Sequence, residues 1–224
     1  MVDAWVLAIA VAAVSISGLS LYVSRVFLPR RMKGAYRKSI TVLAAAVETK
    51  DSGTVGHAQR VAELTKEVAR RLGISGAELE RIEYAALLRD IGKADIPYAI
   101  LNKTEPLTED EWTIVKNHTT KGADMVAAVP FLASCAPYVR HHHEYWDGNG
   151  YPDGLKGSEI PLGSRILAAT SDYDAMISER PYHPVPMAPG QAIDEVLAGS
   201  GTKYDPVVVE VLADLLSAEA AIAA

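Results

Sequence analysis

The sequence predicts an all-α protein: one long apolar helix followed by a helical domain. Apolar residues recur at helical spacing, as in Val61, Leu64, Val68 and Leu72, a run that Gly73 closes. No segment alternates apolar and polar residues as a half-buried strand would. With 49% hydrophobic residues among 224, the chain has material for one domain of roughly 180 residues plus one extra element.

The first element is an uncharged run from Ala4 to Ser24, about as long as a helix needs to cross a bilayer. A core helix is one alternative, but a buried helix rarely lacks charge over so long a stretch. A cleaved signal peptide is another, but Asp3 precedes the run and the positive charges follow it. We therefore predict a single-pass transmembrane anchor over residues 1–28.

Basic residues follow the apolar run, and no acidic residue occurs before Glu48. By the positive-inside rule this asymmetry predicts that the rest of the chain lies in the cytoplasm, with the anchor in the inner membrane. Pro29 and Gly34 interrupt the stretch, which predicts a linker over residues 29–38 and a domain over residues 39–224. The basic residues are Arg25, Arg30, Arg31, Lys33, Arg37 and Lys38.

Helix starts within the domain carry the capping-box pattern, in which two side chains satisfy free backbone N–H groups at a helix start. The helix that opens at Ser75 is expected to end at Gly92, which brings Arg89 and Asp90 to the end of an apolar stripe. The capping pairs are Ser75 with Glu78 and Thr108 with Glu111. Further helices are predicted over residues 139–143 and 165–178, with two amphipathic helices after Pro189.

The segment WDGNGYPDGLKGSEIPLG, residues 146–163, is too rich in Gly and Pro to form regular structure. An irregular segment of this length inside a compact domain is usually functional. The net charge of -6 excludes a strongly basic surface for long nucleic acid, so any nucleotide ligand should be small. Cys135 is the only cysteine, which suits a domain in a reducing cytosol.

Four histidines and one carboxylate are candidate metal ligands. Imidazole nitrogen together with carboxylate oxygen suits Fe, Mn or Zn, whereas Mg and Ca prefer oxygen alone. Each residue taken singly has a simpler explanation, because a lone His at a helix end is more often a cap or a surface group. Neighbours on a helix also diverge by about 100°. The candidates are His57, Asp90, His118, His142 and His143.

Five stretches together resemble the HD-GYP family of cyclic di-GMP phosphodiesterases, within the HD superfamily. The resemblance covers most of the chain from about residue 51 to residue 182. The stretch that begins with HHEYWDGNGYP is long and chemically unusual, so it is the most specific of the five. The stretches are GHAQRVAELTKEVARRLG, LLRDIGKADIPYAILNKTEPLTEDEW, NHTTKGADMV, HHEYWDGNGYPDGLKGSEIPLGSRILA and YDAMISERPY.

The resemblance implies an HD-type helical bundle that holds two or three metal ions at helix ends. It implies catalytic roles for Asp90 and Lys93, because a lysine beside the ions places a charge on the phosphate or protonates the leaving oxygen. The glycine-rich loop would cover the substrate, with Trp146 as a further flat face for guanine. The implied substrate-binding residues are Gly150, Tyr151, Pro152 and Arg180.

The chain departs from the family at three positions. Arg89 stands where the family has the histidine of its His-Asp pair, and arginine cannot bind a cation. Ser171 stands where the family has a ligand aspartate, and Asp172 is one position late. Gly53 replaces a carboxylate that three-metal members use.

The two main substitutions fall on one ion of the family's pair. The resemblance implies a first site made by His57, Asp90 and positions 89 and 171, and a second made by Asp90, His118, His142 and His143. We therefore expect one divalent transition-metal ion, at most two, with the guanidinium of Arg89 neutralising Asp90.

Two functions remain open on the sequence. The first is a phosphodiesterase, weakened in activity, that converts cyclic di-GMP or a related cyclic dinucleotide to pGpG or GMP. The alternative is an inactive module at the membrane that binds a cyclic dinucleotide or a partner protein. A hydrolase for another phosphoester is less favoured, since the Gly-Tyr-Pro loop is present in full. A diguanylate cyclase or sensor partner and a homodimer are also open.

Overall fold

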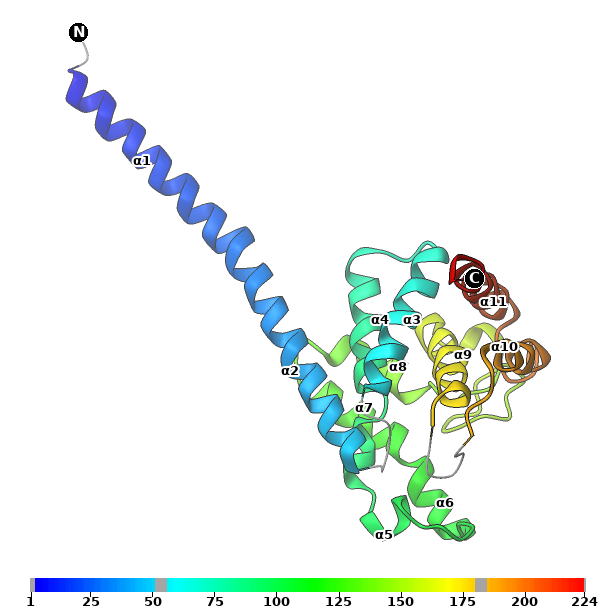
Figure 1. Ribbon diagram of the computed structural model, residues 1–224. Helices are drawn as coiled ribbons and strands as arrows, with labels where there is room; N and C mark the ends of the chain where they lie inside the picture. Colours follow the sequence, from blue (N-terminus) through cyan, green and yellow to red (C-terminus); the bar gives the residue numbers. More distant parts are fainter. Residues whose placement is uncertain (1–2, 51–55, 180–184, 224) are drawn as a thin grey trace. The chain divides into compact units, whose positions relative to one another are not determined.

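The computed structural model describes residues 3–50, 56–179 and 185–223, and within these ranges it contains helices and no strand. The all-α fold predicted from the sequence is confirmed. The chain separates into two compact units, Met1–Ile40 and Thr41–Ala224. Figure 1 shows the helices of each unit in the colours of the sequence.

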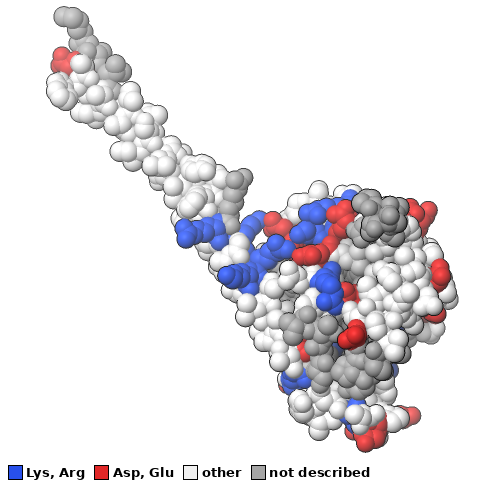
Figure 2. Space-filling view, in the orientation of Figure 1, with Lys and Arg blue, Asp and Glu red and all other residues white. Residues whose placement is uncertain are grey.

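The N-terminal unit is helical. Helix α1 spans Ala4–Tyr22, a π-helical turn η1 spans Val23–Phe27, and α2 spans Leu28–Lys50, of which the residues from Thr41 onward belong to the second unit. Every α1 side chain that the structure describes is exposed, and the helix is long and apolar enough to cross a membrane. In Figure 2 the described side chains of this helix are white, which marks residues other than Lys, Arg, Asp and Glu.

Residues 29–38, predicted as a linker, lie within helix α2. Proline inside a helix removes a backbone hydrogen bond and crowds the preceding turn. The π-helical turn ends at Phe27, two residues before Pro29, and such turns are a recognised way for a helix to absorb a local misfit. Pro29 and Gly34 therefore do not end the helix.

The second unit is a helical bundle joined by short 3-10 turns. Its α-helices are α3 (His57–Arg71), α4 (Gly76–Leu88), α5 (Tyr98–Leu101), α6 (Glu109–Lys116), α7 (His118–Ala127), α8 (Ala136–Arg140), α9 (Leu162–Ile177), α10 (Pro189–Ala198) and α11 (Pro206–Ala223). Its 3-10 turns are η2 (Ile91–Asp95), η3 (Ala133–Cys135) and η4 (Gly157–Glu159).

The main core lies among α3, α4, α9, α10 and α11. Val68, Ile82, Ile166, Val208 and Leu212 are all at most 1% exposed there. Burying one such side chain stabilises a fold by about 1.5–3 kcal/mol, so this cluster is the principal source of stability.

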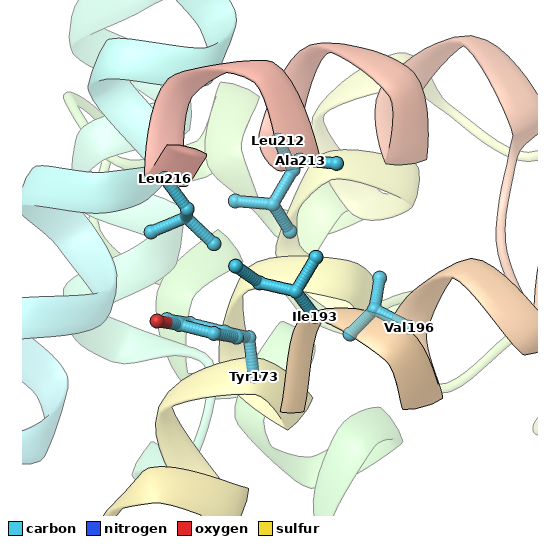
Figure 3. A pocket seen from close by; sticks show the side chains of 6 residues that line it. All are labelled: Tyr173, Ile193, Val196, Leu212, Ala213 and Leu216. Carbon is cyan, nitrogen blue, oxygen red and sulfur yellow. The ribbon is translucent and has the colours of Figure 1, made fainter. Parts of the chain in front are cut away.

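Figure 3 shows a small apolar gap in the main core that has no room for a water molecule. It is lined by side chains of α9, α10 and α11. Binding sites for drug-sized ligands usually measure about 300–1,000 Å³, so this pocket is a packing gap. The lining residues are Tyr173, Ile193, Val196, Leu212, Ala213 and Leu216.

One of the two predicted capping boxes is confirmed. The Thr108 hydroxyl accepts from the Glu111 N–H at 3.2 Å, and the Glu111 carboxylate accepts from the Thr108 N–H at 2.8 Å. The other prediction is wrong, because Ser75 makes no side-chain cap. The Glu78 carboxylate instead accepts hydrogen bonds from Tyr138 and Arg81, so tertiary partners have displaced the local one.

Two predicted helix ends are also corrected. Helix α4 ends at Leu88, and Gly92 lies inside the 3-10 turn η2. A Cβ on Gly92 would overlap the backbone of α7 at His118, so this glycine permits close packing of η2 on α7. Helix α8 ends at Arg140, which leaves the following histidines in a turn.

Candidate metal centre

Three imidazoles meet at one point in the second unit. Ligand nitrogens of His118, His142 and His143 all lie within 4.8 Å of one another. His118 is the first residue of α7, and the other two follow the end of α8. The ring centroids of His142 and His143 are 4.2 Å apart, and each lies about 5.5 Å or less from that of His118.

Two of the rings are held by the backbone of the preceding turn. The Nδ1–H of His118 donates to the carbonyl of Val115 at 2.7 Å, and that of His142 donates to Val139 at 2.7 Å. This contact favours the tautomer whose Nε2 carries a free lone pair. Both Nε2 atoms are buried and have no hydrogen-bond partner among the described residues.

A buried polar atom without a partner costs about 1–3 kcal/mol, so two of them side by side need an explanation. A metal ion supplies one, because ligating imidazoles bind through one nitrogen while the other donates to a carbonyl or carboxylate. The residues present therefore fit a transition-metal ion.

Asp90 lies beside the three imidazoles. Its Oδ1 is 3.7 Å from Nε2 of His118 and 3.2 Å from the ammonium of Lys93, while its Oδ2 is 3.1 Å from the guanidinium of Arg89. Burial by itself would raise the pKa of Asp90, but the charges of Lys93 and Arg89 outweigh it and hold the pKa well below its ordinary value. Asp90 is therefore an anion at neutral pH.

The three imidazoles are neutral at neutral pH. Burial lowers the pKa of His118 and lowers that of His142 further below its ordinary value. It brings the pKa of His143 to about 3. Metal ligation requires neutral imidazole, so no proton has to leave these rings before an ion binds.

His57 contacts a residue to which the sequence analysis gave no role. Its Nδ1 lies 2.5 Å from Oδ2 of Asp174, which also binds the guanidinium of Arg60 at 2.8 and 2.9 Å. Asp174 is 4% exposed, and hydrogen bonds from His57 and Arg60 lower its pKa although burial opposes the shift. A carboxylate that fixes one nitrogen of a histidine leaves the other as a potential ligand atom.

Ser171 and Asp172, neighbours on α9, make different contacts. Ser171 is 8% exposed, and its hydroxyl donates to the carbonyl of Ala168 at 3.4 Å. Asp172 points elsewhere, since its carboxylate accepts from Tyr204 at 2.8 Å and pairs with Lys203 at 2.7 Å. Asp172 is therefore engaged with the turn between α10 and α11.

The glycine-rich loop is fastened to the chain beside the imidazoles. Glu144 is 2% exposed, and its carboxylate accepts from the N–H groups of Asp153 at 2.7 Å and Leu155 at 3.1 Å. Asp153 in turn receives a two-pronged contact from Arg140, 2.7 Å for each bond. Loop residues on both sides of Gly154 are thus tied to the turn that carries the histidines.

Tyr151 faces the imidazoles, whereas Trp146 faces another part of the domain. The Tyr151 ring stacks on His143 with centroids 5.0 Å apart, and its N–H donates to the His143 carbonyl at 3.0 Å. Gly150 just before it packs so tightly that a Cβ would overlap the backbone of Glu144. The Trp146 ring lies under the guanidinium of Arg165, 5.8 Å from the ring centroid.

Some predicted residues have no described position, and besides Asp174 and Glu144 the turn between α10 and α11 also contributes without having been predicted. Arg180 and Gly53 lie outside the described residues. Pro152 follows Tyr151 through a cis peptide bond. The turn between α10 and α11 supports the loop, because Lys203 and Thr202 carbonyls accept from the N–H groups of Trp146 and Asp147. No motif in the sequence marks that turn.

Comparison with known proteins gives one family and a consistent set of relatives. A family model described as HD domain matches residues 41–208. A cyclic di-GMP phosphodiesterase of Thermotoga maritima is 41% identical over 174 residues, which cover 76% of this chain and 47% of that protein. The cyclic di-GMP phosphodiesterase response regulator RpfG of Xanthomonas campestris is 38% identical, covering 79% and 47%. A 3'3'-cGAMP-specific phosphodiesterase 2 of Vibrio cholerae is 35% identical, covering 76% and 33%.

Solved structures agree on the fold. A cyclic GMP-AMP specific phosphodiesterase of V. cholerae, V-cGAP3, superposes with a TM-score of 0.65 at 23% identity, covering 80% of this chain and 48% of that one. The HD domain of the L. monocytogenes phosphodiesterase PgpH, in complex with cyclic-di-AMP, gives 0.54 at 18%, covering 81% and 95%. The chain spans about half the length, or less, of the curated relatives that it matches.

Proposed function

The chain belongs to the HD domain family, and from this premise we propose that it is a metal-dependent phosphodiesterase for cyclic di-GMP or a related cyclic dinucleotide. The two buried Nε2 atoms of His118 and His142 carry the proposal, because they are left without partners beside an anionic Asp90. Relatives named as phosphodiesterases for cyclic di-GMP and for 3'3'-cGAMP support this substrate class.

We assign the ion to Asp90, His118, His142 and His143. A divalent ion bound there supplies Lewis acidity toward a phosphodiester. Lys93, whose ammonium lies 3.2 Å from Asp90, places a positive charge on the same phosphate and donates a proton to the leaving oxygen. Tyr151, which stacks on His143 and lies 5.5 Å from the ammonium of Lys116, would contribute an aromatic contact to the bound nucleotide.

Arg89 argues for one ion and for weakened activity. Its side chain is only 3% exposed and pairs with Asp90 at 3.1 Å, while a second nitrogen donates to the Ala86 carbonyl at 3.0 Å. Arginine keeps its charge under all physiological conditions and has no lone pair to offer. Its guanidinium therefore stands as a fixed cation at the side of Asp90 where family members hold another ion.

The same contact favours one alternative function. A site with Arg89 against Asp90 and serine at position 171 would bind the phosphate of a cyclic dinucleotide without cleaving it. In that case the domain is a binding module. In either case the apolar helix at the N-terminus would anchor it in the inner membrane, with the domain on the cytoplasmic side.

The test uses the full chain in detergent or nanodiscs, loaded with Mn²⁺ or Fe²⁺. Cyclic di-GMP and 3'3'-cGAMP are offered separately, and pGpG, GMP and AMP are separated by chromatography. His142→Ala, which removes one ligand, provides the baseline. Turnover above that baseline supports the enzyme, whereas binding by calorimetry at baseline turnover supports the module.

Measurement of metal content tests separately whether the imidazole cluster is the metal site. His141→Gln is the matched control, because His141 is adjacent to His142 but contacts Asp153 at 2.9 Å. We expect His141→Gln to keep the ion and His142→Ala to lose it. Equal metal content in the two variants would show that the imidazole cluster is not the metal site.

A further inference from the structure

Lys50, the last residue of α2, binds the backbone of the turn that carries Lys93. Its ammonium donates to the carbonyl of Ala94 at 2.6 Å and to that of Ile96 at 2.7 Å. The carbonyl oxygen of Lys93 lies 3.4 Å from the same ammonium. A lysine ammonium has three N–H donors, so all three can be used here. The Asn102 amide also donates to the Lys50 carbonyl at 3.1 Å.

The turn that Lys50 binds packs against α7 through Gly92, and its internal hydrogen bonds are those of a short 3-10 helix. Turn η2 has five residues, and its internal backbone bonds include Lys93 N–H to Asp90 at 2.9 Å and Ile96 N–H to Lys93 at 3.1 Å. Hydrogen bonds in 3-10 helices have poorer geometry than those of α-helices. Carbonyls at the end of a helix carry partial negative charge, which a lysine ammonium stabilises.

The same last turn of α2 also reaches the start of α3. The Glu48 carboxylate accepts from the N–H of Gly56 at 2.9 Å and from that of Ala58. These two residues bracket His57. The end of α2 thus contacts the backbone on both sides of His57 and the backbone that carries Lys93.

We propose that Lys50 is a positioning residue, which holds the turn Ile91–Asp95 so that the Lys93 ammonium stays at Asp90. Lys50 binds the backbone carbonyls of residues 93, 94 and 96. The side chain of Lys93 extends from this stretch of backbone, and its ammonium lies 3.2 Å from Oδ1 of Asp90. The catalytic part of this inference rests on the proposed function. The structural part does not.

The structural part is tested by hydrogen exchange of the full chain, followed by mass spectrometry. Lys50→Met keeps the length of the side chain and removes its charge and donors, whereas Lys50→Arg restores both. Lys66→Met is the control, because Lys66 pairs with Glu83 between α3 and α4. We expect exchange in peptides covering residues 91–97 to rise about tenfold in Lys50→Met, and to stay near wild type in the other two.

The catalytic part is tested by a double-mutant cycle. If Lys50 acts through Lys93, Lys50→Met lowers kcat while KM and metal content stay unchanged, and it lowers nothing further in a Lys93→Gln background. An equal loss in both backgrounds would overturn the positioning role. If Lys50→Met is insoluble, Lys50→Gln takes its place, with the same opposing outcomes.

The two arms distinguish the failure of each proposal. A wild-type protein without turnover removes the phosphodiesterase, but the exchange experiment still decides whether Lys50 holds the turn. Unchanged exchange at residues 91–97 in Lys50→Met removes the inference, even in a fully active enzyme.

Discussion

The guanidinium of Arg89 lies 3.1 Å from the carboxylate of Asp90, and the two residues are adjacent in the chain at the end of α4. Arg89 also donates to the Ala86 carbonyl at 3.0 Å, and its removal would leave Asp90 with Lys93 as its one remaining cation among the contacts described above. Substitution of Arg89 alone should therefore destabilise the domain unless another cation takes its place.

The combined change Arg89→His and Ser171→Asp should raise metal content by one ion per chain. It removes the fixed cation from Asp90 and adds an imidazole and a carboxylate at the first of the two sites that the family resemblance implies. We expect faster hydrolysis of cyclic di-GMP as well. Metal content by atomic emission and kcat are the measurements. Each single variant is the control, and unchanged metal content in the double variant would show that the two positions do not share an ion.

Glu144→Gln should loosen the glycine-rich loop. The carboxylate accepts from both Asp153 and Leu155, and an amide has one oxygen in place of two. We expect a loss of about 1–3 kcal/mol in the free energy of unfolding, measured by urea denaturation, together with weaker binding of cyclic di-GMP. Glu195→Gln on the exposed face of α10 is the control, and an equal effect there would contradict the role of Glu144.

Gly92→Ala should destabilise the domain, because the added methyl group overlaps the backbone of α7 at His118 and Gly122. Overpacking of this kind typically costs about 1–3 kcal/mol. Gly190→Ala in α10 is the matched control, since a methyl group added there would have no atom within 4 Å. Thermal unfolding of both variants gives the comparison, and equal melting temperatures would show that η2 can shift away from α7.

The ion pair of Arg140 with Asp153 should make stability depend on acidic pH. Hydrogen bonding by Arg140 lowers the pKa of Asp153 to about 2. Because this folded-state pKa is depressed, the contribution is complete above the unfolded pKa of about 3.8 and is lost as pH falls toward 2. Urea midpoints between pH 5 and pH 2.5 should fall less steeply in Asp153→Asn than in wild type. Asp194→Asn, on the exposed face of α10, should retain the wild-type slope.

Local sequence patterns predicted the helices well. The spacing around Val68 gave α3, the apolar run after Asp3 gave the N-terminal helix, and the capping pair at Thr108 gave the start of α6. Each of these signals lies within a few turns of the helix that it marks. Where a distant residue competes, as Tyr138 does for Glu78, the local pattern failed.

The arrangement of the candidate site depended on contacts that no local pattern contains. His57 and Asp174 are 117 positions apart, and Lys50 is more than 40 positions from the carbonyls that it binds. Helical spacing alone would make the adjacent histidines diverge, whereas the family resemblance implies that both bind one ion. The two rings do meet, because α8 ends at Arg140 and a turn follows.

The carbonyls of Val115 and Val139 fix the rings of His118 and His142 from within their own turns of chain. These rings therefore lose their rotational freedom when the domain folds, and not when an ion binds. An ion that binds there would need no reorganisation of these two rings, so less of the binding free energy would be lost in ordering them. That part of the affinity would originate in two ordinary backbone oxygens.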